Sequence, residues 1–304
     1  MNMGKTLIVS DIHGNRAALS AVIHHADRHF QFDELWCLGD IVGYGPAPLA
    51  VWQLLREFTI PAGGWLAGNH DWGLVDRLNG PTLIPLESGL NGSSAIPFSN
   101  FRDHAWDVLK FHRLLLEGRE DVLEHLKSLP VMSSPRPGVY LAHGGFDPQP
   151  STSIVMYVYR PMLSPMQMAA DFQQAAQQYP NEALQIDDVT AAPPRVFAFG
   201  QTHIQGLWRW DANNSLWQPE KPKAKYSLNH DLYQTVAFNP GSVGFPRDGN
   251  GCPAYAVIDW ERSELHFRRI PYDSSDMLAA MNESPYAELL AEKGFLADQK
   301  CQEG

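Results

Sequence analysis

The chain has 304 residues and a formal net charge of −11, and 44% of its residues are hydrophobic. A chain of this length forms two domains or one large α/β domain with insertions, and its core needs no disulfides to stay folded. The apolar fraction excludes disordered and fibrous proteins. The acidic balance argues against a protein that binds duplex nucleic acid, which requires a clustered Lys/Arg face.

Three widely spaced cysteines, Cys37, Cys252 and Cys301, predict neither a zinc ribbon nor a disulfide framework. The apolar stretch at residues 6–9 is too short for a secretion signal. A run of about 18 apolar residues, which would predict a membrane span, is absent from the sequence. We therefore expect a cytoplasmic protein with no membrane partner.

Short apolar runs alternate with amphipathic stretches through the first half of the chain, a pattern typical of α/β proteins. Residues 79–100 are rich in Gly, Pro, Ser and Asn and predict a long loop. The predicted strands cover 5–10, 34–39 and 60–67, and the predicted helices cover 15–29, 46–58, 101–116 and 118–128.

The second half has mostly strand patterns, with a Gln/Ala-rich helix near 164–178. Its predicted strands cover 139–142, 195–199, 207–210, 235–238, 254–258 and 265–267. The sequence shows no internal repeat and no linker-like segment. We predict a single domain over residues 1–304, with insertions at about 79–130 and 146–193 and a C-terminal helical tail from about 273.

Polar clusters follow five of the predicted strands. In open α/β sheets ligands bind outside the carboxyl ends of the strands, so these clusters are expected to converge. Asp, Asn and His suit Mn, Zn, Fe or Co. Each cluster alone is as easily a turn or a helix N-cap, and only their joint, ordered occurrence predicts a metal site. The clusters are Asp11-Ile12-His13-Gly14-Asn15, Gly39-Asp40, Gly68-Asn69-His70-Asp71, His143-Gly144 and Gly200-Gln201-Thr202-His203.

This ordered set resembles the calcineurin-like metallophosphoesterases, and residues 39–46 and 239–244 are typical of their small prokaryotic phosphodiesterases. The resemblance implies an α/β fold, a four-layer α/β/β/α sandwich of two mixed sheets. It also implies two divalent metal ions, Mn or Fe/Zn, with Ni, Co and Mg as further options. The implied ligands are Asp11, His13 and His203 for the first ion, Asn69, His143 and Gln201 for the second, and Asp40 between both. His70 would face the phosphoryl group and stabilise charge or protonate the leaving oxygen.

This sequence departs from the family pattern at two places. Gln201 replaces the first histidine of Gly-His-x-His, and an amide oxygen is a weaker ligand than imidazole, so we expect a weakly held second metal. Gly43 and Tyr44 stand where the protein-phosphatase branch has Asp and Arg. Tyr44 is a candidate substrate-binding residue, although a packed loop tyrosine is an equally good interpretation. Arg160, Arg247 and residues 91–104 are pocket candidates by position alone, with surface roles favoured.

The expected function is that of a metal-dependent phosphoesterase. It would hydrolyse a phosphodiester, or a phosphomonoester, of a small substrate by attack of a metal-bridged hydroxide. One alternative is a nucleotide or dinucleoside-polyphosphate hydrolase. A second alternative, of a different class, is a weakly active or inactive metal-binding scaffold, which Gln201 makes plausible.

Overall fold

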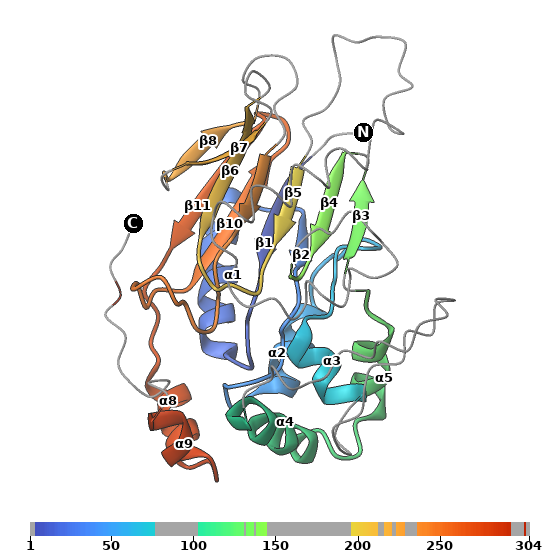
Figure 1. Ribbon diagram of the computed structural model, residues 1–304, viewed down its shortest axis with the longest axis vertical. Coiled ribbons are helices and arrows are strands. Elements are labelled where there is room, and N and C mark those ends of the chain that lie inside the picture. Colours follow the sequence, from blue (N-terminus) through green and yellow to red (C-terminus); the bar gives the residue numbers. More distant parts are fainter. Residues whose placement is uncertain are drawn as a thin grey trace.

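The computed structural model describes residues 4–76, 103–130, 132–136, 138–144, 196–211, 216–220, 223–228, 236–292 and 301. Within them the strands form two mixed sheets (Figure 1). The first sheet has the order β2-β1-β10-β11-β8, with β2 (Glu34–Cys37), β1 (Lys5–Val9), β10 (Ala254–Asp259), β11 (Glu264–Arg269) and β8 (Lys225–Ser227). The second has the order β3-β4-β5-β9-β6-β7, with β3 (Met132–Arg136), β4 (Val139–Ala142), β5 (Val196–Phe199), β9 (Val236–Asn239), β6 (Gly206–Asp211) and β7 (Leu216–Glu220).

Side chains of the helices share one core with the face of the first sheet that is turned away from the second sheet, and α1 packs directly on that sheet. Helix α1 begins after Asn15, whose side chain accepts a hydrogen bond from the Ala18 N–H and caps the helix. Helix α2 begins with Pro48, a residue that is favoured in the first turn of a helix. The helices are α1 (Arg16–Phe30), α2 (Pro48–Leu55), α3 (Asn69–Asp76), α4 (Asp103–Leu115), α5 (Glu120–Ser128), α8 (Ser275–Asn282) and α9 (Ala287–Glu292).

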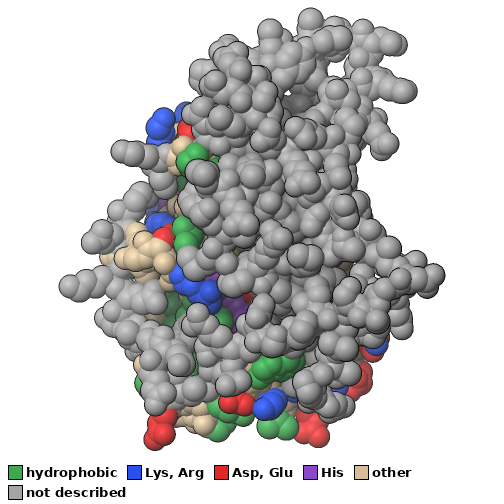
Figure 2. Space-filling view, in the orientation of Figure 1, with side chains coloured by type: hydrophobic (Ala, Val, Ile, Leu, Met, Phe, Trp, Pro, Cys, Tyr) green, Lys and Arg blue, Asp and Glu red, His purple; other side chains and the backbone are tan. Residues whose placement is uncertain are grey.

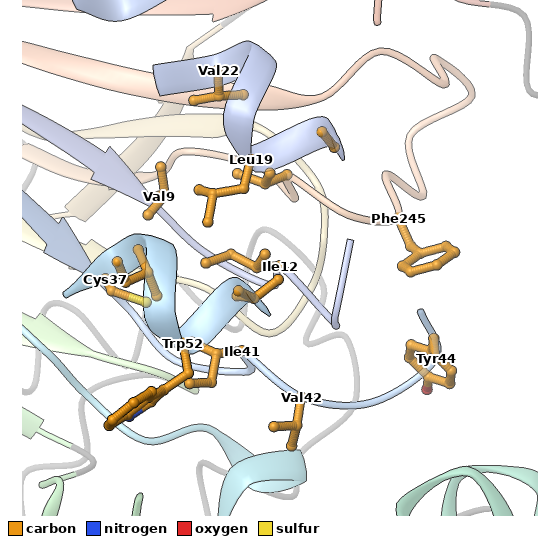
Figure 3. Close-up of a cluster of buried hydrophobic side chains, with 14 of the residues drawn as sticks. Val9, Ile12, Leu19, Val22, Cys37, Ile41, Val42, Tyr44, Trp52 and Phe245 are labelled. Carbon is orange, nitrogen blue, oxygen red and sulfur yellow. The ribbon is translucent and has the colours of Figure 1, made fainter. Parts of the chain in front are cut away.

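Two hydrophobic cores result from the alternation of side chains along the strands. Leu7 and Val9 of β1 face the helices, whereas Ile8 between them faces the second sheet. Figure 3 shows the first core where it approaches the ends of β1 and β2, with Ile12 and Ile41 among its side chains. These two buried residues anchor the loops that follow the strands, because Ile12 lies between Asp11 and His13 and Ile41 comes directly after Asp40.

The predicted α/β fold with two mixed sheets is confirmed. The predicted strand over 60–67 is wrong, because Trp65 makes only an isolated bridge to Cys37 and Gly63 turns the backbone with a φ of 76°. Strands β3, β7 and β8 and helix α3 were not predicted. The two serines and the proline of β3 and the single buried residue of β8 give no clear alternation.

Helices α4 and α5 lie inside the predicted insertion at 79–130, yet they contribute Val108, Leu109 and Val122 to the first core. This part of the insertion therefore packs into the body of the fold. The predicted loop over 79–100, the insertion at 146–193 and the helix near 164–178 lie outside the described residues. The single-domain organisation stays a prediction.

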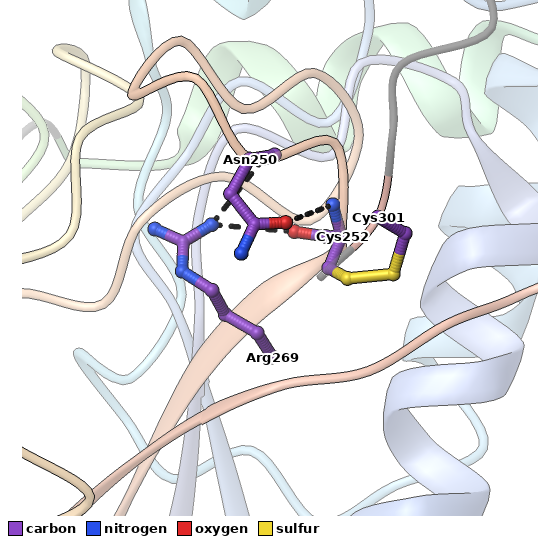
Figure 4. The surroundings of a disulfide bond; sticks show 4 residues. All are labelled: Asn250, Cys252, Arg269 and Cys301. Carbon is purple, nitrogen blue, oxygen red and sulfur yellow. Dashed lines mark hydrogen bonds between the residues drawn. A yellow bond between two sulfur atoms is a disulfide. The ribbon is translucent and has the colours of Figure 1, made fainter. Parts of the chain in front are cut away.

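The expectation about the cysteines needs a correction. Cys252 and Cys301 form a disulfide, with Cα atoms 4.6 Å apart (Figure 4). The pairing was not predicted because 49 residues separate the two cysteines and only the fold brings residue 301 beside the segment that leads into β10. Cys37 is a buried free thiol in β2. In the part of the chain that the structure describes, no helix is long and apolar enough to cross a membrane.

Candidate metal centre

Most of the predicted site residues lie on loops at the carboxyl ends of strands, whereas Asn69 and His70 begin helix α3. Backbone hydrogen bonds hold the loops together. Asp11 N–H donates to Gly39 O at 3.0 Å, and His13 N–H donates to Asp40 O at 2.9 Å, which joins the loops after β1 and β2. The backbone N–H of Gln201 reaches across to both carboxylate oxygens of Asp11 at 3.1 Å. Loops from both sheets therefore meet at one place.

Five of the seven predicted metal ligands have a left-handed backbone, which is uncommon for residues other than glycine. Such conformations persist only where the surrounding structure holds them, and they concentrate at functional sites. Here the inter-loop hydrogen bonds and the buried Ile12 and Ile41 hold them. The φ angles are 51° for Asp11, 49° for His13, 54° for Asp40, 63° for Gln201 and 60° for His203.

Each of the three predicted histidine ligands has its Nδ1 atom against a backbone carbonyl. The distances are 2.9 Å from His13 to Val42 O, 2.7 Å from His143 to Leu38 O and 2.6 Å from His203 to Phe245 O. A carbonyl only accepts, so each Nδ1 carries the proton. This fixes the tautomer and leaves Nε2 as the nitrogen that can bind a metal. Histidine ligands in metal sites usually donate their other ring N–H to a carbonyl or a carboxylate in the same way.

The Nε2 atoms converge on two groups of ligands. In the first, His13 Nε2 lies 3.1 Å from His203 Nε2, which is 3.3 Å from Asp11 Oδ1. In the second, His143 Nε2 lies 3.2 Å from Asn69 Oδ1. Asp40 Oδ2 lies between the groups, 3.6 Å from His13 Nε2 and 3.4 Å from His143 Nε2.

The charges of this buried cluster favour a cation. Burial alone would raise the pKa of Asp40, but His143 and His70 outweigh it and hold the pKa below its ordinary range. Burial lowers the pKa of His13 and of His203 well below the ordinary value, so both imidazoles are neutral. Two neutral nitrogens that face each other across 3.1 Å repel unless a positive ion accepts both lone pairs. The donor set therefore fits divalent cations.

His143 shows how a proton and a cation compete for the same position. Burial opposes a charge on its ring, yet Asp40 outweighs burial and raises the pKa of His143 to about 9. Burial also raises the pKa of Asp11 to about 7. A cation at the centre would replace these protons, because ligands bind metal in their deprotonated form.

His70 lies beside the ligands. Its backbone N–H donates to Asp40 Oδ1 at 2.8 Å, and its ring centroid lies 4.7 Å from that of His13. A Cβ atom added at Gly43 would lie 2.3 Å from His70 Nδ1. Glycine at this position therefore leaves room for the imidazole, and the aspartate of the protein-phosphatase pattern would not fit with this placement of His70.

Tyr44 is buried in the loop after β2. Its ring centroid lies 4.6 Å from that of His13, 4.8 Å from that of His70 and 5.7 Å from that of Phe245. These contacts support the interpretation of Tyr44 as a packed loop residue. A direct contact with substrate stays a prediction.

Two residues that support the site were given no role by the sequence. The buried Asp71 carboxylate accepts hydrogen bonds from the backbone N–H groups of Ile41, Val42 and Gly68 and so ties the loop after β2 to the start of α3. The sequence could have indicated this role, because Asp71 belongs to the Gly-Asn-His-Asp cluster that contains Asn69 and His70. His112 of α4 contacts the loop from Gly43 to Gly45, and no local pattern marks it. Arg160 and residues 91–102 lie outside the described residues.

The chain is similar in sequence to proteins of other organisms. An uncharacterised protein of Methanocaldococcus jannaschii is 25% identical over 290 residues, covering 95% of this chain and 96% of its own length. The symmetrical bis(5'-nucleosyl)-tetraphosphatase of Yersinia enterocolitica is 39% identical over 70 residues, which are 23% of this chain and 24% of that protein.

Solved structures show the same fold. A metallophosphoesterase from Sphaerobacter thermophilus has a TM-score of 0.63 and 25% sequence identity, over 92% of this chain and 93% of that one. A hypothetical protein from Pyrococcus horikoshii has a TM-score of 0.57 at 15% identity, over 99% of this chain and 100% of that one. The sequence pattern of the calcineurin-like phosphoesterases matches residues 4–189, more than half of the chain. The chain belongs to the calcineurin-like phosphoesterase family.

Proposed function

We propose that the protein is a metal-dependent phosphoesterase that hydrolyses a phosphodiester or phosphomonoester bond of a small substrate. The observation that carries the proposal is the position of Asp40. One of its carboxylate oxygens lies within 3.6 Å of both His13 Nε2 and His143 Nε2, which belong to different ligand groups. A carboxylate in this position suits a pair of cations, which need a negative ligand between them.

In this proposal Asp11, His13 and His203 hold one ion, Asn69, His143 and Gln201 hold the other, and Asp40 contacts both. Divalent cations at such a centre would provide the positive charge that binds a phosphate group. They would also lower the pKa of water, so that a nucleophile is available at neutral pH. The protein contributes the orientation. Three carbonyl groups fix the imidazole rings, and the backbone N–H of His70 fixes one oxygen of Asp40.

His70 is the proposed catalytic residue. It lies next to His13 and Asp40 without belonging to either proposed ligand set, and the residue is buried. An imidazole in this position is suited to donate a proton to a leaving oxygen or to stabilise the charge that develops on the phosphoryl group.

A second candidate function is hydrolysis of dinucleoside polyphosphates. The similarity to the Yersinia tetraphosphatase over 70 residues favours it. A metal-binding scaffold with little activity is the alternative of a different class, and the amide at Gln201 is the observation in its favour.

Metal analysis combined with hydrolysis assays distinguishes these functions. The protein is stripped of metal, reloaded separately with Mn, Fe, Zn, Ni, Co or Mg, and tested on bis(p-nitrophenyl) phosphate, p-nitrophenyl phosphate and diadenosine tetraphosphate. Two bound ions with turnover support the phosphoesterase, and preference for the tetraphosphate supports the second candidate. One bound ion and no turnover with any metal supports the scaffold. Asp40→Asn is the matched variant, since it keeps the shape but removes the charge, and we expect it to lose metal and activity together.

A further inference from the structure

Arg247 lies at the rim of the candidate metal centre. Its backbone N–H donates to His203 O at 3.1 Å, so the residue directly faces the loop that carries one of the predicted metal ligands. The segment before it contains Phe245, whose carbonyl accepts the Nδ1 proton of His203. The side chain of Arg247 is exposed. Its main chain is therefore fixed to the centre while its side chain is accessible to a ligand.

The guanidinium of Arg247 extends over Tyr44. Its Cζ atom lies 5.9 Å from the centre of the Tyr44 ring, and Nη2 lies 3.5 Å from Tyr44 Oη. The same tyrosine ring packs against His13 and His70. The guanidinium is thus separated from a predicted metal ligand and from the proposed catalytic histidine by a single aromatic ring. On the face shown in Figure 2, Lys or Arg atoms lie beside His atoms.

No carboxylate among the described residues forms an ion pair with Arg247. The adjacent Asp248 pairs with Arg269 and accepts a hydrogen bond from Gln205 N–H at 3.2 Å. Within the described part of the chain its guanidinium therefore carries a positive charge that no carboxylate there neutralises. Since a guanidinium matches the oxygen geometry of phosphate, its position beside a cationic centre suits an anionic ligand.

We propose that Arg247 binds phosphate oxygens of the substrate beside the metal centre. The inference rests on the proposed phosphoesterase function. Tyr44 stands where the protein-phosphatase branch has an arginine, and in this protein the segment after β9 supplies an arginine whose guanidinium reaches the same residue. Tyr44 supports the guanidinium through its ring face and its hydroxyl group. A phosphate monoester, which exposes more charged oxygens than a diester, gains more from this contact.

Binding of inorganic phosphate to the metal-loaded protein tests the proposal without requiring turnover. Isothermal titration is carried out on the wild type, Arg247→Ala and Arg247→Lys, with the metal content measured in the same samples. Arg262→Ala is the matched control. Arg262 is also exposed, but it pairs with Asp259, which lies opposite Lys5 at the far end of β1.

We expect Arg247→Ala to weaken phosphate binding by about 10- to 100-fold, the range for a charge-assisted hydrogen-bond pair. Arg247→Lys should restore part of the affinity, because it keeps the charge but not the planar fork. Arg262→Ala should stay within about twofold of the wild type, and the metal content should be equal in all proteins. The KM for p-nitrophenyl phosphate should rise more in Arg247→Ala than the KM for the diester.

Unchanged phosphate affinity in Arg247→Ala overturns the proposal, as does a metal-loaded wild type that binds no phosphate. If Arg247→Ala loses metal, Arg247→Lys decides, since wild-type affinity in a fully loaded lysine variant also overturns it. Failure of the proposed function gives a different result. In that case the loaded wild type hydrolyses none of the esters, while Arg247 still determines its affinity for phosphate.

Discussion

Replacing His112 should change how the stability of the protein depends on pH. The buried imidazole accepts a hydrogen bond from Gly43 N–H at Nδ1, 3.1 Å away, and donates one from Nε2 to Gly45 O, 2.7 Å away. These two bonds hold the backbone on both sides of Tyr44. Because Nδ1 must accept, a proton there would face the N–H of Gly43, and the geometry admits only the neutral ring.

The size of the effect follows from the pKa. Burial lowers the pKa of His112 from 6.5 to about 4. Above pH 6.5 the ring is neutral in both the folded and the unfolded chain. Between pH 6.5 and 4 the unfolded chain takes up a proton that the folded protein does not, so stability falls as the pH falls. At about 1.4 kcal/mol per pH unit, the loss over this interval is about 3 kcal/mol.

Urea unfolding of metal-free protein between pH 8 and 4.5 measures this loss, with chelator present throughout so that release of cations contributes nothing. His112→Asn keeps an acceptor near Nδ1, and His112→Gln keeps a donor near Nε2, but neither side chain titrates. At pH 8 we expect each variant to be less stable than the wild type by about 1–3 kcal/mol, because one hydrogen bond is lost and a buried polar group is left unsatisfied. Towards pH 4.5 this difference should shrink by about 2–3 kcal/mol. Unfolding free energies of wild type and variants that stay parallel across this range would refute the reasoning.

Three further substitutions test the site. His70→Ala should keep the metal content but lower kcat by about 100-fold or more, the usual contribution of a general acid, and an unchanged rate would contradict the assigned role. Gln201→His should raise occupancy of the second cation, measured by elemental analysis, because imidazole is the stronger ligand, and unaltered metal content would count against the assignment. Asp71→Asn turns an amide group towards N–H donors of the backbone, so the free energy of unfolding should fall by about 2–4 kcal/mol, and wild-type stability in urea would argue against it.

Much of the fold and the placement of the candidate site follow from local patterns. Apolar runs at residues 5–10 and 139–142 predict buried strands, and the polar residues that come directly after them lie at the strand ends. The convergence of these loops follows from the parallel pairing of β1 with β2 and of β4 with β5. The roles assigned to the ligands and to His70 stay predictions, since their test is chemical.

The features that were not predicted depend on contacts between distant parts of the chain. His112 lies in an amphipathic helix and reaches a loop 67 residues earlier, so its spacing carries no information about that contact. Arg247 reaches Tyr44 across 203 residues, and the disulfide joins Cys252 to residue 301. The segment 60–67 shows the opposite case. Its apolar composition predicts a strand, but the turn at Gly63 interrupts the extended backbone and only an isolated bridge forms.

The left-handed backbone of the predicted ligands carries a conformational cost that the rest of the site must offset. A side chain in this conformation costs about 1–2 kcal/mol relative to the ordinary region, and glycine avoids most of that cost. At His13 and His203, replacement by glycine would relax the main chain while removing an imidazole nitrogen. Each replacement would also leave a cavity and an unpaired carbonyl, because both rings are buried and bond Val42 O and Phe245 O. The relaxed main chain would therefore offset only part of the lost stability, and the side chains themselves stabilise the strained backbone that carries them.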